Sequence, residues 1–397
     1  MNVLFISYIF PYPPTGGEKE RAYHIIKYLS QRNRVFLYSL CDDKNDLKYK
    51  EELEQYCASI NIYYIHPALS IIRSIICFFS SYPFVFAYFF SYCMNREIKK
   101  TIKNILIDAI FAYGLTSAQY VSGKETMIKC VDLAPVNYNR ITRLIEKLFP
   151  QSLLGALEAR KIKKWEEKTD KAFDVLIVSS EIEKAKTISI SPSSTDKIKV
   201  LANGVDFNYF MQNKSKKHTK TILFASQINF FPDEDAMIYF HNNVLPLIIK
   251  QMPSILFYII GEKLPSYVKN ICKKAIIIEK NGEEIINYLT KATVYIAPMR
   301  VHGEQQNNIL RAMAVGVPVV ATRKALQGLN VVKDKEIMIE DTPEEFARCI
   351  LMLLRDEEKR IYIASNARRY VEYFHNWENN LMVINDIFQK TRSNAGQ

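Results

Sequence analysis

Polar and glycine residues gather directly after several predicted strands, which is where parallel α/β sheets bind their ligands. The first such segment runs from Ser7 to Glu18 and opens a predicted helix. Its glycines, Gly16 and Gly17, would let backbone amides approach an anion at the helix N-terminus. The segment matches neither the dinucleotide-binding fingerprint nor the P-loop, which argues against a dehydrogenase or a P-loop NTPase. A plain turn explains the glycines equally well.

Two further segments lie in the other half of the chain. Asn203 and Gly204 follow a predicted strand and by themselves indicate a turn. After the strand that ends at Ala297, polar side chains crowd the start of a helix, and these are Arg300, His302, Glu304, Gln306, Asn307 and Asn308. A helix N-terminus of this kind attracts phosphate, and an ordinary cap by one of the asparagines is the alternative. Histidines elsewhere show no metal-ligand spacing, so we expect no metal site.

The elements that position these residues alternate between short apolar runs and helical patterns, which indicates parallel sheets with helices on both faces. The predicted strands are Val3–Ser7, Val35–Leu40, Ile60–Ile65, Ala109–Tyr113, Met127–Val131, Val175–Ser179, Ile198–Leu201, Ile222–Ala225, Leu256–Ile260, Ile276–Ile278, Val294–Ala297 and Val317–Ala321. The predicted helices include Glu18–Gln31, Ile98–Leu106, Arg160–Asp170, Asp235–Ile249, Glu283–Leu289 and Asn308–Val315.

The alternation breaks over Ile188–Lys197, whose serine, threonine and proline content is typical of a linker, and then restarts. We therefore predict an N-terminal domain over residues 1–190 and a C-terminal domain over 198–372, with a last helix over 373–397 packing back on the first domain. Two doubly wound, Rossmann-like domains that face each other would form a cleft lined by the carboxyl ends of their strands.

Composition and charge narrow the classes of protein. Hydrophobic residues make up 48% of the 397 residues, which excludes a disordered chain. The net charge of +11 suits anionic partners such as phosphates or an acidic membrane surface, and a basic protein without such a partner is the alternative. No nucleic-acid-binding module appears, so we expect no nucleic acid partner. The 7 cysteines and the lack of a basic region before the apolar N-terminus predict a cytoplasmic protein without disulfides.

The uncharged aromatic segment Ser74–Asn95 is long enough to span a bilayer, but Pro83 interrupts it and tyrosine and phenylalanine outnumber leucine. We interpret it as two short helices broken at Pro83 that lie on a membrane surface or form an acceptor groove. Packing in the core and a true span are the alternatives. Basic helix residues, Arg160, Lys161, Lys163 and Lys164 among them, would help to hold anionic lipid or a lipid-diphosphate acceptor at the inner face of the plasma membrane, and a plain solvated helix face is the alternative.

Several of these segments together resemble the motifs of GT-B glycosyltransferases, family 4 in particular. The stretch A-M-A-V-G-V-P-V-V after the polar loop is similar to the family's nucleotide-sugar motif, and N-G-V-D is similar to the start of its C-terminal domain. The opening F-P-Y-P-P-T-G-G resembles the family's acceptor loop. T-S-A-Q-Y and the V-D that ends at Asp132 look like an exopolysaccharide-associated subgroup.

The resemblance implies a transfer of a sugar from a nucleotide-sugar donor to a cell-surface glycan or a lipid-linked acceptor, with retention and without a metal or another cofactor. The implied acceptor-binding residues are Gly16, Gly17, Glu18 and Lys19, and the implied catalytic residues are Asp132, His302 and Glu304. The implied donor-binding residues are Asn203, Gly204, Ser226, Gln227, Gly261, Arg300, Gln306, Asn307, Asn308 and Arg311. Cationic side chains and helix-terminal amides would stabilise the leaving diphosphate.

The donor motif departs from the family's pattern. The second of the family's two glutamates is replaced by Arg311, and the first falls at Gly303 with Glu304 adjacent. Ser226 and Gln227 stand where the family has an Arg/Lys pair. Either Arg300 and Arg311 supply the cationic contacts, since arginine suits bidentate phosphate binding, or the protein is a catalytically silent scaffold for an active partner. A sugar-nucleotide 2-epimerase is a further alternative on the same fold.

Overall fold

The computed structural model shows a chain that divides into two compact units. Unit 1 comprises Met1–Ala202 and Leu381–Gln397, and unit 2 comprises Asn203–Asn380. The structure describes residues 1–14, 17–78, 80–121, 127–133, 151–190, 192–207, 220–225, 231–261, 266–272, 276–279, 287–301, 306–326 and 328–395.

Unit 1 is built on a parallel sheet in the order β3-β2-β1-β4-β5-β6-β7. Its strands are β1 (Asn2–Ser7), β2 (Arg34–Cys41), β3 (Ser59–Tyr64), β4 (Ala109–Tyr113), β5 (Ile128–Asp132), β6 (Val175–Val178) and β7 (Ile198–Val200). The chain reverses its direction of winding between β1 and β4, where Leu4 pairs with Ile110. This order is that of a doubly wound Rossmann-like fold.

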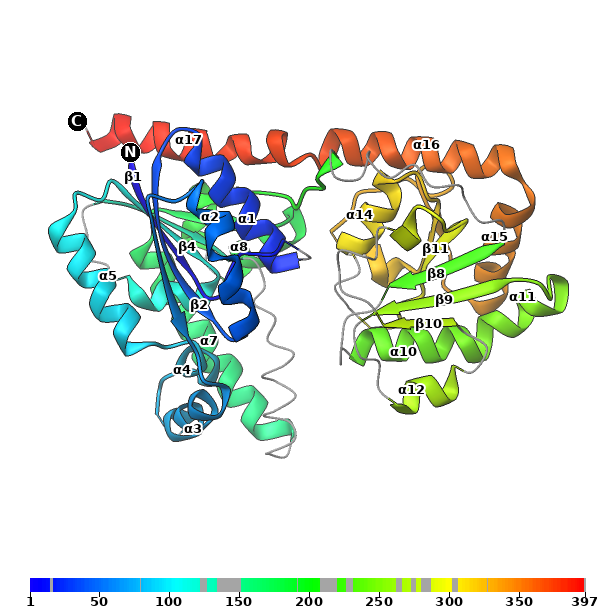
Figure 1. The fold of residues 1–397 in the computed structure, drawn as a ribbon, viewed down its shortest axis with the longest axis horizontal. Helices are drawn as coiled ribbons and strands as arrows, with labels where there is room; N and C mark the ends of the chain where they lie inside the picture. Colours follow the sequence, from blue (N-terminus) through cyan, green and yellow to red (C-terminus); the bar gives the residue numbers. More distant parts are fainter. Residues whose placement is uncertain are drawn as a thin grey trace. The chain divides into compact units, whose positions relative to one another are not determined.

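Helices cover this sheet because their apolar faces match its buried strands. They are α1 (Gly17–Ser30), α2 (Lys50–Glu54), α3 (Pro67–Phe78), α4 (Phe84–Tyr88), α5 (Tyr92–Asn104), α7 (Gln151–Ala172), α8 (Glu181–Ile190) and, from Leu381 onwards, α17 (Trp377–Ala395), with the 3₁₀ turns η1 (Lys44–Tyr49), η2 (Leu115–Tyr120) and η3 (Pro192–Lys197). In α17, Leu381 and Ile384 are buried, and Asn385 donates a 2.5 Å hydrogen bond to the hydroxyl of Tyr28 in α1. The C-terminal helix thus lies beside α1 in unit 1 (Figure 1).

The aromatic segment around Pro83 is broken into helices as predicted, but α4 lies in the core. Pro83 is the N-cap of α4, and all of Phe84–Tyr88 is buried. Trp165 of α7 packs on Phe86 with ring centroids 4.8 Å apart, and the Glu158 carboxylate accepts the backbone N–H of Phe84. The prediction that these aromatic residues face a membrane or an acceptor groove is therefore wrong for α4. No helix in the described ranges is both long and apolar enough to cross a bilayer.

Unit 2 repeats the same architecture, with strand order β10-β9-β8-β11-β12-β13. Its strands are β8 (Thr221–Ala225), β9 (Leu256–Gly261), β10 (Ile276–Glu279), β11 (Val294–Ala297), β12 (Val319–Ala321) and β13 (Met338–Ile339). Its helices are α10 (Phe231–Tyr239), the π-helical turn η4 (Phe240–Val244), α11 (Leu245–Gln251), α12 (Ser266–Ile271), α14 (Gln306–Ala314), η5 (Arg323–Leu326), α15 (Pro343–Arg355) and α16 (Glu357–Phe374). The helix predicted over Asp235–Ile249 contains the π turn because Pro246 has no N–H to continue the helical ladder.

The boundary between the units lies later than the sequence indicated. β7 was expected to open the second domain, but its Ile198 pairs with Leu176 of β6 in the sheet of unit 1. The serine-rich segment before it is the short turn η3 that connects α8 to β7, rather than a linker between domains. Turn residues favour tight local connections as well as linkers, so composition alone does not separate the two.

Candidate functional site

Three of the predicted donor-binding residues that the structure describes lie at one edge of the sheet of unit 2. The order of its strands reverses between β8 and β11, and ligands of doubly wound sheets bind outside the carboxyl ends of strands at such a switch point. Gly261 ends β9, Arg300 follows β11, and Gln306 begins α14. The edge of the sheet therefore gathers residues that are far apart in the sequence.

Some of the predicted site residues cannot be placed. Gly16, Ser226, Gln227, His302 and Glu304 lie outside the described residues. The roles predicted for them stay predictions. Among the parts of the chain that the structure does describe, no group of histidine, cysteine, aspartate and glutamate residues could hold a metal ion.

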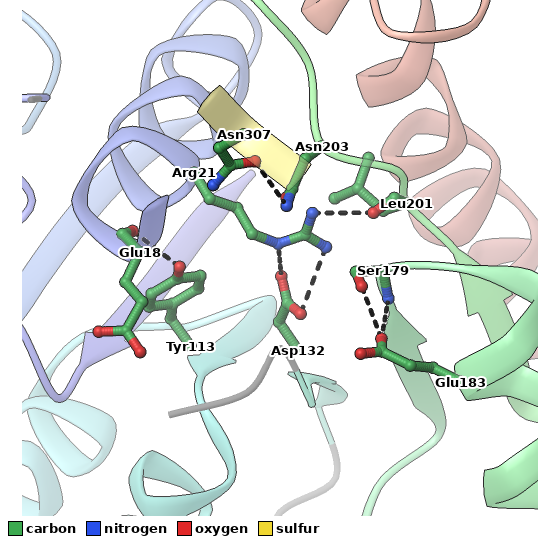
Figure 2. A network of polar contacts seen from close by, with 9 residues as sticks. All are labelled: Glu18, Arg21, Tyr113, Asp132, Ser179, Glu183, Leu201, Asn203 and Asn307. Carbon is green, nitrogen blue, oxygen red and sulfur yellow. Dashed lines mark hydrogen bonds and ion pairs between the residues drawn. The ribbon is translucent and has the colours of Figure 1, made fainter. Parts of the chain in front are cut away.

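The asparagines of two predicted donor segments meet in unit 2. The side-chain amide of Asn203 donates to Oδ1 of Asn307, 3.3 Å away, as Figure 2 shows. Asn307 lies in the first turn of α14, and Asn308 beside it is buried. Gly316 ends the helix in a left-handed conformation (φ 74°), with the N–H of Val317 bonded to the carbonyl of Ala312, which is a Schellman cap. The sequence therefore located both the start and the end of α14.

Arg300 is held by its own unit. Its Nε donates to Oδ2 of Asp235 at 3.0 Å, and its Nη2 donates to the other oxygen of the same carboxylate. The guanidinium also lies 4.8 Å from the centroid of the Tyr239 ring. The hydrogen bond to Asp235 raises the pKa of Arg300, although the side chain is 53% exposed. An acidic partner thus already neutralises much of the charge that a phosphate would meet there.

Arg311 points into unit 2 rather than to bulk water. It lies in α14 with 8% of its surface exposed, close to the fully buried Tyr295 and Asp233. Burial raises the pKa of the Tyr295 phenol most, Asp233 raises it further, and Arg311 lowers it. The charge reversal noted in the sequence is therefore accommodated inside the fold.

Asn203 and Gly204 also belong to a clamp between two segments of unit 2. Nδ1 of His375 donates to the carbonyl of Asn203 at 2.9 Å, and the N–H of Val205 donates to the carbonyl of His375 at 2.8 Å. A Cβ at Gly204 would lie 2.6 Å from the ring of Trp377. Nothing in the sequence connects His375 or Trp377 to this turn, because the two segments are far apart along the chain.

The clamp predicts a pH dependence of stability. Burial lowers the pKa of His375 below the 6.5 of the unfolded chain. Unfolding then takes up a proton below pH 6.5, so the neutral imidazole's contribution is complete above pH 6.5 and is lost as the pH falls towards the folded-state pKa. In urea unfolding, the stability difference between the wild type and His375→Gln should therefore be smaller at pH 5 than at pH 8. A constant difference would contradict this prediction.

In unit 1, Asp132 forms a buried ion pair with Arg21 at the carboxyl end of β5 (Figure 2). Nε of Arg21 lies 2.8 Å from Oδ2 of Asp132, and Nη2 lies 3.4 Å from Oδ1. Nη1 donates to the carbonyl of Leu201 at 2.8 Å. The exposed fractions of the two side chains are 2% and 0%, so Asp132 faces Arg21, and its catalytic role stays a prediction. Arg21 was not predicted as a site residue. Its one signal in the sequence is that it stands directly before Ala22, an apolar residue on the buried face of α1.

The described acceptor residues lie at the start of α1. Gly17 opens the helix in a left-handed conformation (φ 45°), and the carbonyl of Glu18 accepts the hydroxyl of Tyr113 at 2.7 Å. Nζ of Lys19 lies 2.5 Å from Asp46. Tyr8 stacks on Tyr113 with ring centroids 5.7 Å apart. These contacts fix the loop after β1 and the first turn of α1 against β4.

Comparisons with known proteins agree with the two-unit architecture. A family model described as "Glycosyl transferases group 1" matches residues 219–356, which lie within unit 2. No curated protein sequence matches the chain.

Among solved structures, sucrose-phosphate synthase from Thermosynechococcus elongatus is similar at a TM-score of 0.72 and 14% identity, over 99% of both chains. A glycosyltransferase from Rickettsia africae gives 0.67 and 14% over 98% of both chains. HepE of Anabaena in complex with UDP-glucose gives 0.65 and 16% over 99% of this chain and 100% of that one. At these identities the likeness shows the fold alone.

Proposed function

We propose that this chain, a GT-B fold protein with a glycosyl transferases group 1 region in its second unit, transfers a sugar from a nucleotide-sugar donor to a cell-surface glycan or a lipid-linked acceptor. The family match carries the proposal, because it covers β8, β11 and α14, the elements around the switch point of unit 2. HepE has been solved with UDP and with UDP-glucose, so UDP is the first nucleotide to test.

Each unit has its own task in this proposal. The amides and Asn307 at the start of α14 bind the donor diphosphate, where the helix dipole favours negative charge. As the bond from the anomeric carbon to the diphosphate breaks, these groups stabilise the charge on the leaving oxygen. The acceptor hydroxyl attacks the anomeric carbon and gives its proton to a carboxylate or imidazole, for which Glu304 and His302 remain our predicted candidates. The start of α1 binds the acceptor.

The finer features of the reaction are also part of the proposal. We propose retention of the anomeric configuration and turnover without a metal, so that chelation by EDTA leaves the rate unchanged. A lipid-linked acceptor would bring the protein to the inner face of the plasma membrane as a peripheral protein. The net charge of +11 supports a partner of that kind.

A thermal-shift panel tests the donor. A nucleotide present at about 100 times its dissociation constant stabilises the folded state by about 2.7 kcal/mol, which raises the melting temperature by several degrees. We expect such a shift with UDP or a UDP-sugar, and with GDP or CMP compounds if the base differs. If none of these nucleotides shifts the melting temperature, a catalytically silent scaffold is the interpretation that remains. A shift together with isomerisation of the donor sugar, without its transfer, would indicate a 2-epimerase.

The same assay can test the site. Asn307→Ala should weaken nucleotide binding about tenfold, the cost of about one hydrogen bond. Asn366→Ala is a matched control, because Asn366 is an asparagine of α16 whose amide bonds only its own helix, at the carbonyl of Tyr362. Equal affinity of the two variants would remove Asn307 from the donor site.

A further inference from the structure

Helix α3 of unit 1 carries aliphatic side chains on its outer face as well as on the face that packs on the core. Its outer stripe is aliphatic, with Leu69 64%, Ile72 53% and Ile76 70% exposed. Its inner face packs on the core through Ile71 and Ile75 and buries two serines, Ser70 at 3% and Ser74 at 0% exposed. Surface helices of globular proteins place one apolar stripe on the core and polar residues on the opposite face, so the second, exposed stripe of α3 is unusual.

Buried hydrogen bonds fix this orientation. Nε of Arg73 donates to the carbonyl of Ala87 at 2.6 Å, and Nη2 donates to the carbonyl of Tyr88 at 2.9 Å. Arg73 thus adds hydrogen bonds to carbonyl groups in the last turn of α4, where helical carbonyls lack a full set of intrahelical partners. Ser74 bonds the carbonyl of Ser70 at 2.8 Å. The bond of Ser74 lies within α3, but rolling the helix would break both bonds of Arg73 to α4, so the exposed stripe is a stable feature of the fold.

We propose that Leu69, Ile72 and Ile76 of α3 insert into the boundary between the headgroups and the acyl chains of an anionic bilayer. The helix has 12 residues and so a length of about 18 Å, well short of the hydrocarbon core of about 30 Å. It would therefore lie in the plane of the interface, as amphipathic helices do.

Charge favours lipid as the occupant. The sequence contains no aspartate or glutamate between Glu54 and Glu97, so no carboxylate of this segment repels an anionic headgroup. At the N-terminal end of α3, the exposed Lys44 lies 5.1 Å from the ring of Tyr64, which is 39% exposed. Tyrosine and lysine are typical of the polar side of a membrane interface.

Helix α7 adds positive charge at the same end of unit 1. α3, α4 and α7 gather there (Figure 1), with α4 bonded to α3 through Arg73 and packed on α7 through Trp165. Arg160, Lys163 and Lys164 of α7 are exposed. Clustered lysine and arginine side chains next to an apolar stripe bind anionic lipid. A stable protein interface buries roughly 800 Å² on each partner, and a stripe of three side chains is much smaller. This difference disfavours a dimer contact through α3.

The surface deepens the proposed function, because a lipid-linked acceptor would be met at the bilayer. Co-sedimentation of the full chain with vesicles tests it, using phosphatidylcholine with phosphatidylglycerol against phosphatidylcholine alone. We expect the wild type to bind the anionic vesicles, and binding to fall at least tenfold in the double variant Ile72→Glu and Ile76→Glu. Both positions are exposed, so the melting temperature should stay unchanged.

Ile361→Glu is the matched control, since Ile361 is 57% exposed on α16 of unit 2. It should bind vesicles as the wild type does. Failure of the wild type to bind anionic vesicles, or undiminished binding by the double variant, would overturn the proposal. So would a concentration-dependent dimer that the double variant abolishes, because the stripe would then be a contact between copies. If the chain bound anionic vesicles but no nucleotide shifted its melting temperature, the proposed membrane-binding surface would be supported and the proposed glycosyltransferase function would be rejected.

Discussion

Replacing Arg21 by methionine should lower the free energy of unfolding of unit 1 by about 3–5 kcal/mol. The substitution leaves the carboxylate of Asp132 fully buried without its cation and removes the donor to the carbonyl of Leu201. A buried charge without a partner costs far more than the pair contributes, because the desolvation penalty remains while the attraction is lost. Asp132→Leu should lower the free energy of unfolding by a similar amount, because it leaves the guanidinium of Arg21 buried without its carboxylate.

The two tryptophans allow this measurement in one unit at a time. The chain has 2 tryptophans, and Trp165 lies in unit 1 while Trp377 lies in unit 2. Urea unfolding followed by Trp165 fluorescence in a Trp377→Phe background therefore reports unit 1. Lys50→Met is the control, since its pair with Glu54 is exposed and 3.9 Å long and should contribute less than about 0.5 kcal/mol.

The double variant Arg21→Met with Asp132→Leu separates a structural role from a catalytic one. With both charges gone, most of the lost stability should return, since apolar replacements of buried pairs are often neutral or stabilising. If this refolded variant still turned over donor at the wild-type rate, Asp132 would be a structural residue. If it were stable and inactive, the predicted catalytic role would be supported. Wild-type stability of Arg21→Met alone would contradict the premise that the pair is buried.

The regular elements were predictable because their pattern is local. β4 occurs at Ala109–Tyr113, as predicted, since all five of its residues are buried and its apolar run ends at Gly114. In α1, predicted as a helix over Glu18–Gln31, the apolar residues at helical spacing are all buried, and these are Ala22, Ile25, Ile26 and Leu29. An apolar run of strand length, or one face of a helix, needs no knowledge of the rest of the chain.

The pairing of charges was not predictable, because it depends on how the sheets bring distant residues together. Asp132 is 111 positions from Arg21, and Asp235 is 65 positions from Arg300. The sequence placed Asp132 and Arg300 near strand ends, but it did not show that an acidic partner already holds each arginine. The same holds for α3, whose aliphatic stripe looks like a core-facing one until the bonds of Arg73 fix its orientation.

A methyl group at Gly204 should destabilise unit 2 by about 3 kcal/mol, the upper end of the range for overpacking. A Cβ there would lie 2.6 Å from Cγ and Cδ2 of Trp377 and 2.7 Å from its backbone nitrogen. The ring could rotate away, but the backbone nitrogen lies next to the bridge between Val205 and Asn376. Gly204→Ala therefore has to move one of the two segments of the clamp.

Gly316→Ala is the informative comparison, because it separates backbone strain from crowding. Gly316 has φ 74° and nothing within 4 Å of an added Cβ, so alanine should cost about 1 kcal/mol from strain alone. Unfolding of both variants is measured by Trp377 fluorescence in a Trp165→Phe background. In a Trp377→Ala background, where unfolding is followed by circular dichroism, Gly204→Ala should lower the free energy of unfolding by less than in the wild type. The loss should not disappear, because the contact with the backbone nitrogen of residue 377 remains. An equal cost with and without the indole would show that the ring does not crowd the turn.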